Sequence, residues 1–221
     1  MAKKTYSYDY PRPMVTVDCV LLRVVEGRLE ALLVRRKHAP AKDKWALPGG
    51  FVGMNEPLEQ AVLREVQEET GLEQVSCLTQ FGAYGDPKRD PRGRVISIAY
   101  IGIIAEGNAA DPVAGDDALE AEWHAVEKPP HGMAFDHPTI LGDALLRLGV
   151  GGRTSGVLFA FLPARFTTEQ MAAVLNAVYG MKVDARKYLA PFADAQVVKA
   201  TKDGKAWKYV GWHKGMRRKN G

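Results

Sequence analysis

The sequence has few cysteines and no long apolar stretch. Only two of its 221 residues are cysteines, Cys19 and Cys77, and neither lies in a CxxC pair. Two cysteines are too few for a disulfide framework, so we expect buried free thiols in a reducing cytosol. No apolar run approaches the roughly 20 residues of a membrane-spanning helix, and the first residues carry no apolar signal segment. These absences favour a cytoplasmic protein that does not bind membranes.

The five histidines show no ligand spacing, and the chain contains no long internal repeat or low-complexity tract. We therefore expect neither a histidine-based metal site nor a repeat architecture. An apolar fraction of 46% is ordinary for a globular protein and can form a core. The chain length favours one full domain followed by a small one.

Charge is distributed unevenly along the chain. Residues 1–150 contain 17 Lys and Arg against 22 Asp and Glu, whereas residues 151–221 contain 13 against 4. We therefore expect an acidic domain at 1–150 and a basic domain at 156–221, joined by a glycine-rich linker. A basic domain is able to bind nucleic acid, but the same composition is found on solvated surfaces.

Apolar periodicity predicts a mixed α/β or α+β domain in the first 150 residues. We expect strands at 14–22, 30–36, 75–84, 94–104 and 121–125, and a second helix at 139–148. The first helix is expected to be capped by Asn55 or Glu56, with Pro57 in its first turn, and to end at Gly71. Beyond the linker we expect a strand at 157–162, helices at 169–179 and from 183, and a hairpin at 197–210.

Three carboxylates share one face of the first helix. Glu65, Glu68 and Glu69 are spaced i, i+3 and i+4, and like charges at this spacing destabilise a helix. A divalent cation reverses that effect, because hard cations such as Mg²⁺ prefer oxygen ligands and also bind phosphates. Arg64 is able to hold a carboxylate in a bidentate pair, and Glu56 is its expected partner.

This segment resembles the Nudix box, G-x5-E-x7-R-E-U-x-E-E-x-G-U, in which U is a bulky aliphatic residue. The matching residues are Gly50, Glu56, Arg64, Glu65, Val66, Glu68, Glu69, Gly71 and Leu72. The resemblance implies a Nudix fold, a mixed sheet sandwiched by helices. It also implies that Glu65, Glu68 and Glu69 bind Mg²⁺ or Mn²⁺ with the Gly49 carbonyl nearby, in a pyrophosphatase that uses Arg64 and takes substrate at Gly50.

A second cluster is a cationic loop stiffened by proline and glycine. It contains Lys88, Arg89, Asp90, Arg92 and Arg94 and precedes an apolar strand. Such a loop can bind phosphates through its cations. The alternative interpretation is an exposed turn closed by surface ion pairs. The loop resembles that of ADP-ribose pyrophosphatases and of Nudix-related transcriptional regulators. The resemblance implies that Arg89, Asp90, Arg92 and Arg94 bind ADP-ribose or a related nucleotide.

Nudix hydrolases often take a further acidic residue from outside the box. Asp116, Asp117 and Glu120 are the candidates for a catalytic base, and we choose Glu120. Trp123 is interpreted as a core residue rather than a base-stacking one. Tyr6, Tyr8 and Tyr10 fit either base stacking or an alternating strand at a dimer interface.

Residues 156–221 resemble the winged-helix domain of Nudix-related regulators of NAD metabolism. The resemblance implies double-stranded DNA as a partner, a homodimer, and phosphate contacts from Arg186 and Lys187 at the recognition helix and from Lys202 and Lys205 at the wing. The sequence departs from that family in two ways: its Nudix box is intact, and Pro191 interrupts a helix with few arginines. A hydrolase, a nucleotide-sensing regulator and a protein that does both therefore remain open, as does a hydrolase whose basic domain binds RNA or another protein.

Overall fold

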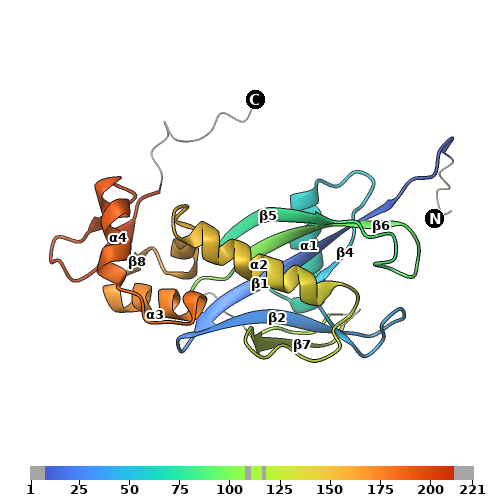
Figure 1. The fold of residues 1–221 in the computed structure, drawn as a ribbon, viewed down its shortest axis with the longest axis horizontal. Helices are drawn as coiled ribbons and strands as arrows, with labels where there is room; N and C mark the ends of the chain where they lie inside the picture. The colour runs from blue at the N-terminus through green and yellow to red at the C-terminus, as the bar shows by residue number, and fades with distance from the viewer. Residues whose placement is uncertain (1–7, 108–110, 116–117, 212–221) are drawn as a thin grey trace.

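The computed structural model describes residues 8–107, 111–115 and 118–211. Tyr6, Asp116 and Asp117 lie outside these residues. A mixed sheet forms the centre of the first unit, and helices α1 (Leu58–Thr70) and α2 (His137–Gly152) cover its opposite faces (Figure 1). Across the described ranges, no helix combines the length and apolar character needed to cross a bilayer.

The sheet has seven strands in which β1 is the central one. Its members are β1 (Met14–Val25), β2 (Arg28–Arg36), β3 (Trp45–Ala46), β4 (Gly49–Phe51), β5 (Cys77–Tyr84), β6 (Val95–Ile103) and β7 (Ala118–Ala125). The order is β3-β2-β1-β6-β5, with β4 paired to β1 and β7 to β2. β1 runs parallel to β6 and antiparallel to β2 and β4, which confirms the predicted mixed sheet.

β1 is buried on both faces, which explains its nearly continuous apolar sequence. Successive side chains of a strand point to opposite faces. The residues packed on the α1 side are Val17, Cys19 and Leu21, and those on the α2 side include Val20 and Leu22. Asp18 interrupts this pattern with a buried charge. Cys19 is buried as expected, whereas Cys77 is only half-buried because β5 is an edge strand.

The start of α1 differs from the prediction. The residue at the N-cap is Pro57, and no side chain caps the helix. Glu56 does not cap it because its carboxylate accepts hydrogen bonds from the Gly53 N–H and from Arg64. The helix ends at Gly71 with a positive φ of 70°, which confirms the predicted stop.

The second unit contains two helices and a small sheet. Its elements are β8 (Arg165–Phe166), α3 (Thr168–Tyr179), α4 (Ala185–Asp194), β9 (Val198–Ala200) and β10 (Trp207–Tyr209), with strand order β8-β10-β9. Thr167 and Gln170 form a capping box at the start of α3. The β9–β10 hairpin confirms the predicted one, and Pro191 lies within α4 without ending it.

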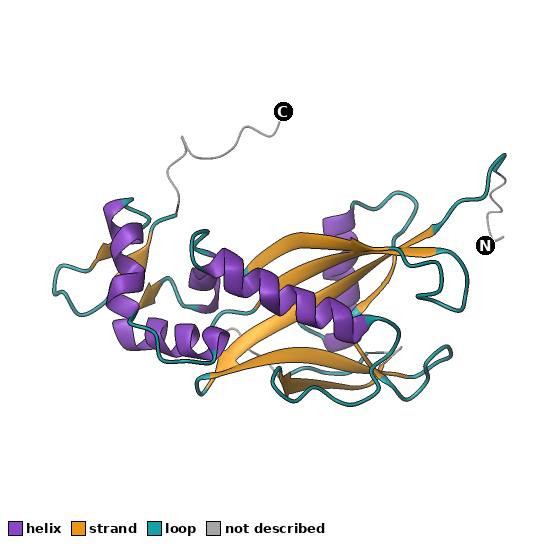
Figure 2. Cartoon of the chain, in the orientation of Figure 1, coloured by secondary structure: helices purple, strands orange, loops and turns teal. Residues whose placement is uncertain are grey.

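Two predictions about the junction are wrong. α2 continues to Gly152, so the first half of the expected linker is helix, and residues 157–161 form the 3₁₀ helix η1 (Val157–Phe161) instead of a strand. Burial explains the difference. Leu158, Phe159 and Phe161 are inserted into a hydrophobic core that runs without a break from β1, β2 and β6 through α2 to α3 and α4. Figure 2 shows the two units side by side along α2.

Hydrogen bonds reinforce this junction at the C-terminal end of α2. The Tyr179 hydroxyl donates to the Gly149 carbonyl at 3.2 Å, and the Tyr188 hydroxyl donates to the Gly152 carbonyl at 2.6 Å. These carbonyls belong to the last turn of a helix, where intrahelical partners are lacking. The second unit therefore completes α2 and shares its core.

We expect Leu189→Ala to destabilise the entire chain rather than the second unit alone. Leu189 is fully buried in the shared core, and such truncations typically lower the free energy of unfolding by about 2–5 kcal/mol. Urea unfolding followed by far-UV circular dichroism and tryptophan fluorescence should show one coincident transition. Leu146→Ala, at a 68% exposed position of α2, is the control and should shift stability by less than about 0.5 kcal/mol. Two separated transitions would contradict the shared core.

Candidate active site

Arg64 holds the carboxylates of the box together. Its Nε and Nη2 donate to the two oxygens of Glu56 at 2.7 and 2.9 Å, which confirms the predicted pair. Its Nη1 donates to Glu65 at 2.7 Å and to Glu68 at 2.9 Å. The hydrogen bonds from Arg64 lower the pKa of Glu56 to about 2. One guanidinium thus fixes three acidic side chains around the start of α1.

The two glycines of β4 allow α1 to approach the sheet closely. The Gly49 N–H donates to Glu69 at 3.0 Å. A Cβ added to Gly50 would lie 2.5 Å from the carboxylate of Glu65, and one added to Gly49 would lie 2.2 Å from the Val17 carbonyl oxygen. A side chain at Gly50 would therefore push the Glu65 carboxylate away from the sheet, and one at Gly49 would push β4 away from β1.

Burial changes the protonation of two of these carboxylates. It raises the pKa of Glu69 to about 8, and it also raises the pKa of Glu65. Two adjacent buried anions are unfavourable unless a cation compensates them. Carboxylate and carbonyl oxygens are the donors that hard divalent cations prefer, so the residues present fit such an ion.

The carboxylates are not arranged around a common point. Within the described part of the chain, no three His, Cys, Asp or Glu side chains converge closely enough to hold a metal ion. Arg64 accounts for this, because it engages Glu65 and Glu68. A bound cation would have to take these oxygens from Arg64.

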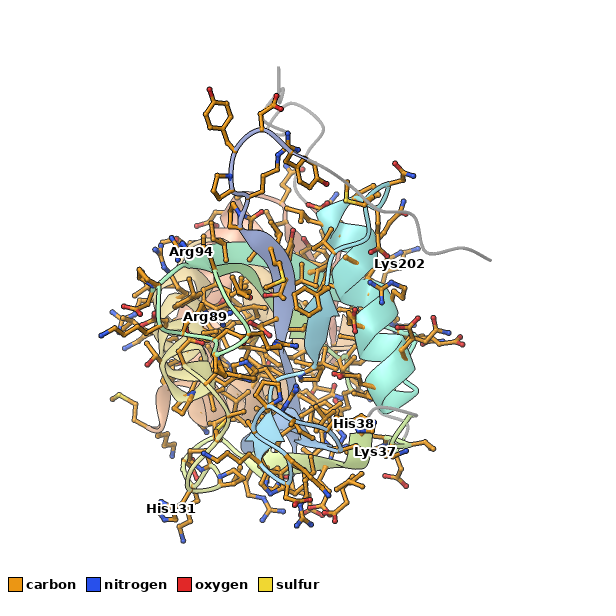
Figure 3. All side chains as sticks on the ribbon, turned by 90° about the vertical axis from the view of Figure 1, so that its right-hand side faces the viewer. Lys37, His38, Arg89, Arg94, His131 and Lys202 are labelled. Atoms are coloured by element: carbon orange, nitrogen blue, oxygen red, sulfur yellow. The ribbon has the colours of Figure 1, made fainter. Side chains whose placement is uncertain are left out.

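Arg89 is buried, with only 4% of its side chain exposed. Its Nε and Nη2 donate to the two oxygens of Asp136 at 2.9 and 2.7 Å, and Nη2 also lies 3.4 Å from Asp18. Asp136 is the N-cap residue of α2. Arg89 therefore joins the loop between β5 and β6 to the start of α2, and it does not face solvent. Figure 3 labels Arg89 and Arg94 on this loop.

The other loop residues divide into a buried anchor and two exposed cations. Asp90 is buried and accepts hydrogen bonds from the Arg92 backbone N–H at 2.9 Å and from its guanidinium, at 3.0 Å from Nε and 2.6 Å from Nη2. Arg92 remains 36% exposed, and Arg94 is exposed and donates to the Gly85 carbonyl. Of the four predicted substrate-binding residues of the loop, Arg92 and Arg94 are thus the accessible ones.

Three polar residues at this site were missed by the sequence analysis. Asp18 is buried beside Ser97, Arg89 and His137, and only its position as a lone charge in an apolar strand could have indicated it. Asp136 is the partner of Arg89, and Arg36 lines the same small hollow as Arg89 and Arg92. Burial, followed by the nearby charge of Arg92, lowers the pKa of Arg36.

His137 has the structural role that was expected. Its Nδ1 accepts a 2.8 Å hydrogen bond from the Leu47 N–H, and burial lowers its pKa, which favours the neutral ring. Trp123 packs against the α1-side core beneath Arg23, so its prediction as a core residue is confirmed.

Glu120 lies on β7, and its side chain is 42% exposed. It accepts a 2.8 Å hydrogen bond from Arg35 on the neighbouring strand β2. This cross-strand ion pair is the polar contact that Glu120 makes in the structure, and its role as a base stays a prediction.

The NUDIX domain family matches residues 12–143, which is more than half of the chain. The chain belongs to the NUDIX family. The matched region begins before β1 and ends within α2, so it contains α1, the glycine strand β4 and the loop of Arg89 to Arg94. NUDIX hydrolases generally use divalent metal ions, in agreement with the oxygen donors of this site.

Two relatives of known function match different shares of this NUDIX protein. The ADPR responsive transcriptional repressor NtrR of Acinetobacter baylyi is 30% identical over 200 residues, which cover 89% of this chain and 79% of the repressor. An ADP-ribose pyrophosphatase of Methanocaldococcus jannaschii is 45% identical over 135 residues, which cover 61% of this chain and 74% of the enzyme.

Solved structures resemble nearly the whole chain. A MutT/nudix family protein from Enterococcus faecalis matches with a TM-score of 0.80 at 29% identity, covering 93% of this chain and 89% of that protein. Shewanella oneidensis NrtR matches with a TM-score of 0.73 at 25% identity, covering 88% and 92%. The Shewanella protein has also been solved with a 27mer DNA, and its NUDIX domain with ADP ribose.

The raised pKa of Glu69 predicts that metal affinity depends on pH. Near neutral pH most metal-free molecules carry a proton on Glu69, and a cation has to displace it. Affinity should therefore rise with pH up to about 8 and level off above, with about tenfold weaker binding at pH 7 than at pH 9. Calorimetric Mg²⁺ titrations at both pH values measure this. Glu69→Gln should bind weakly at both, and equal wild-type affinity at pH 7 and pH 9 would contradict the assignment.

Proposed function

We propose that residues 1–150 hydrolyse the pyrophosphate of a nucleoside diphosphate derivative, with ADP-ribose as the leading substrate and AMP and ribose 5-phosphate as products. The observation that carries this proposal is the placement of the box carboxylates against Gly49 and Gly50, where no side chain covers the backbone. The 45% identity to an ADP-ribose pyrophosphatase supports the choice of substrate.

Glu65, Glu68, Glu69 and the Gly49 carbonyl would hold Mg²⁺ or Mn²⁺, which when bound neutralises pyrophosphate charge and lowers the pKa of a water ligand. Arg64 positions the carboxylates before binding, because it is hydrogen-bonded to Glu65 and Glu68. Its remaining bonds to Glu56 keep it beside the helix when those two carboxylates turn away.

The reaction requires a water, a proton acceptor and an oriented pyrophosphate. The water oxygen bonds to one phosphorus, the bridging P–O bond breaks, and the water proton passes to a carboxylate of the chain. Glu120 is our candidate acceptor, and it has to leave Arg35 to act. Arg92 and Arg94, which are the accessible cations of the loop, orient the phosphates.

ADP-ribose incubated with the full chain and Mg²⁺ should yield AMP and ribose 5-phosphate. Replacing Glu68 and Glu69 together by Gln should lower kcat by about 100-fold or more, since charge stabilisation at the transition state is lost. Product formation followed by chromatography measures the rate, and circular dichroism verifies that the variant is folded. A wild-type chain that binds ADP-ribose without turnover would refute the enzyme and leave a sensor.

We also propose a second function, in which residues 156–221 form a winged-helix unit that binds double-stranded DNA as part of a homodimeric, ADP-ribose-responsive repressor. One feature of the small sheet favours it. Lys208 of β10 pairs directly with Arg165 of β8 on one side and with Lys199 of β9 on the other. Like charges placed opposite each other across strands are destabilising, so this exposed row of cations is best explained by an anionic partner.

The other predicted DNA contacts are exposed cations of the same unit. Lys202 and Lys205 are exposed in the hairpin loop, and Arg186 and Lys187 are exposed in the first turn of α4. Trp207 and Tyr209 are largely used for packing: Trp207 donates to the Thr168 hydroxyl, and the Tyr209 ring stacks on Phe159. Phosphate contacts therefore account for the surface better than base stacking does. The repressor and DNA-complex structures cited above support this function.

Duplex DNA from upstream of the chain's own gene should bind in a strongly salt-dependent manner. Replacing Lys208 by Ala should weaken binding and reduce the slope of log affinity against log salt by about 1, since one phosphate contact is lost. Gel shifts at several salt concentrations, with and without ADP-ribose, measure both effects. Lys128→Ala, an exposed position of the first unit, is the matched control. An unchanged slope in Lys208→Ala, or no preference for this duplex over an unrelated one, would rule out the repressor.

A further inference from the structure

Four planar side chains alternate along one edge of the active site. The Arg36 guanidinium lies 5.2 Å from the centre of the Phe135 ring. The Arg92 guanidinium lies 5.8 Å from the centre of the same ring. Arg92 also lies 4.7 Å from the centre of the Phe51 ring. The order is therefore cation, ring, cation, ring, which we call the planar row. Contacts of this kind between guanidinium groups and aromatic faces are attractive.

The row ends in an open ring. Phe51 is 40% exposed, although it follows Gly49 and Gly50 directly on β4. The Arg92 guanidinium is already held by Asp90, whose two carboxylate oxygens accept hydrogen bonds from it, so the contact with Phe51 is not required to fix Arg92. An exposed phenylalanine contributes little to stability, so its place at the end of an ordered stack favours a ligand contact.

The backbone at Phe135 and two buried ion pairs fix the planar row in place. Phe135 has a positive φ of 50°, a conformation that is unusual for an aromatic residue and is found where surrounding structure enforces it. It directly precedes Asp136, which Arg89 holds through two hydrogen bonds. Both rings and Arg92 are thus tied to buried charged pairs, Asp136 with Arg89 and Asp90 with Arg92.

The positions of the Phe51 ring and of the box carboxylates allow a single nucleotide to contact both. Phe51 follows Gly50, the residue whose missing side chain leaves room for Glu65. Strand residues alternate in direction, so Phe51 emerges on the side of the cationic loop rather than on the side of α1. Phe51 is the next residue of β4 after Gly50, so a ligand whose phosphate lies at the carboxylates has to cross bare glycine backbone to reach it. The parts of a nucleotide that extend beyond its phosphate are the sugar and the base.

We infer that the open face of Phe51, backed by Arg92, is the platform on which the substrate's nucleobase stacks. Every base presents an aromatic face, and stacking on an aromatic side chain provides affinity without requiring a specific set of hydrogen bonds. Phe51 is then a specificity-determining residue that favours nucleotides over phosphorylated sugars. The inference rests on the proposed hydrolase function, since it takes the pyrophosphate to lie at the box carboxylates.

Equilibrium binding of the two proposed products tests the platform without any turnover. Titration calorimetry with AMP and with ribose 5-phosphate is carried out on the full chain and on Phe51→Ala, Phe51→Tyr and Met54→Ala. We expect AMP to bind Phe51→Ala about tenfold more weakly or worse, as is typical when a stacked aromatic is removed. Ribose 5-phosphate should be unaffected, Phe51→Tyr should retain AMP binding, and Met54→Ala, 63% exposed in the following loop, should match the wild type.

The outcomes separate this inference from the proposed function. If Phe51→Ala binds AMP as the wild type does, or if AMP does not bind the wild type, the platform is wrong. An equal loss for AMP and ribose 5-phosphate also overturns it, because the ring would then hold the sugar or the loop. Should AMP binding depend on Phe51 while ADP-ribose is not hydrolysed, the platform stands and the hydrolase proposal fails.

Discussion

The active site depends on the close contact between α1 and the glycines of β4. Glu69 reaches the Gly49 N–H, and Glu65 lies where a Gly50 side chain would be. This contact partly buries two carboxylates and raises their pKa values, so ionising them at this place is unfavourable without a cation. The core on the α1 side, built on Val62 and Val66, supplies the packing that keeps the helix there.

Arginines act differently at this site according to their burial. Arg64 lies on α1 with 34% of its side chain exposed and holds the carboxylates of Glu56, Glu65 and Glu68. Arg89 is buried and holds Asp136 at the start of α2, so it contributes to the architecture. Arg92 combines the two roles, since Asp90 fixes it while its guanidinium stays partly exposed beside Phe51. Two arginines of one loop thereby differ: Arg89 is buried in an ion pair, whereas Arg92 leaves part of its guanidinium accessible.

α2 connects the active site with the second unit. Its first residues contact Arg89 and Asp18, and its last carbonyls accept hydrogen bonds from Tyr179 and Tyr188 of the second unit. A single hydrophobic core accompanies the helix along this path. A change at the N-terminal end of α2 therefore has a continuous packed route to α3 and α4, which is the physical requirement for coupling between a nucleotide site and a DNA site. This architecture suits an enzyme and a regulator equally.

The sequence by itself determined the local features: the box on one helix, the end of that helix at Gly71, the Arg64–Glu56 pair, the capping box at Thr167 and the basic character of the second unit. Each of these depends on residues close together in the chain, whose geometry follows from helix spacing and turn chemistry. Only the tertiary structure decided that Arg89 is buried with Asp18 and Asp136 as its partners while Arg92 is open, and that α2 extends into the glycine-rich junction as far as Gly152. Those outcomes depend on contacts between residues 47 to 71 positions apart and on a shared core, and burial there outweighs local preference.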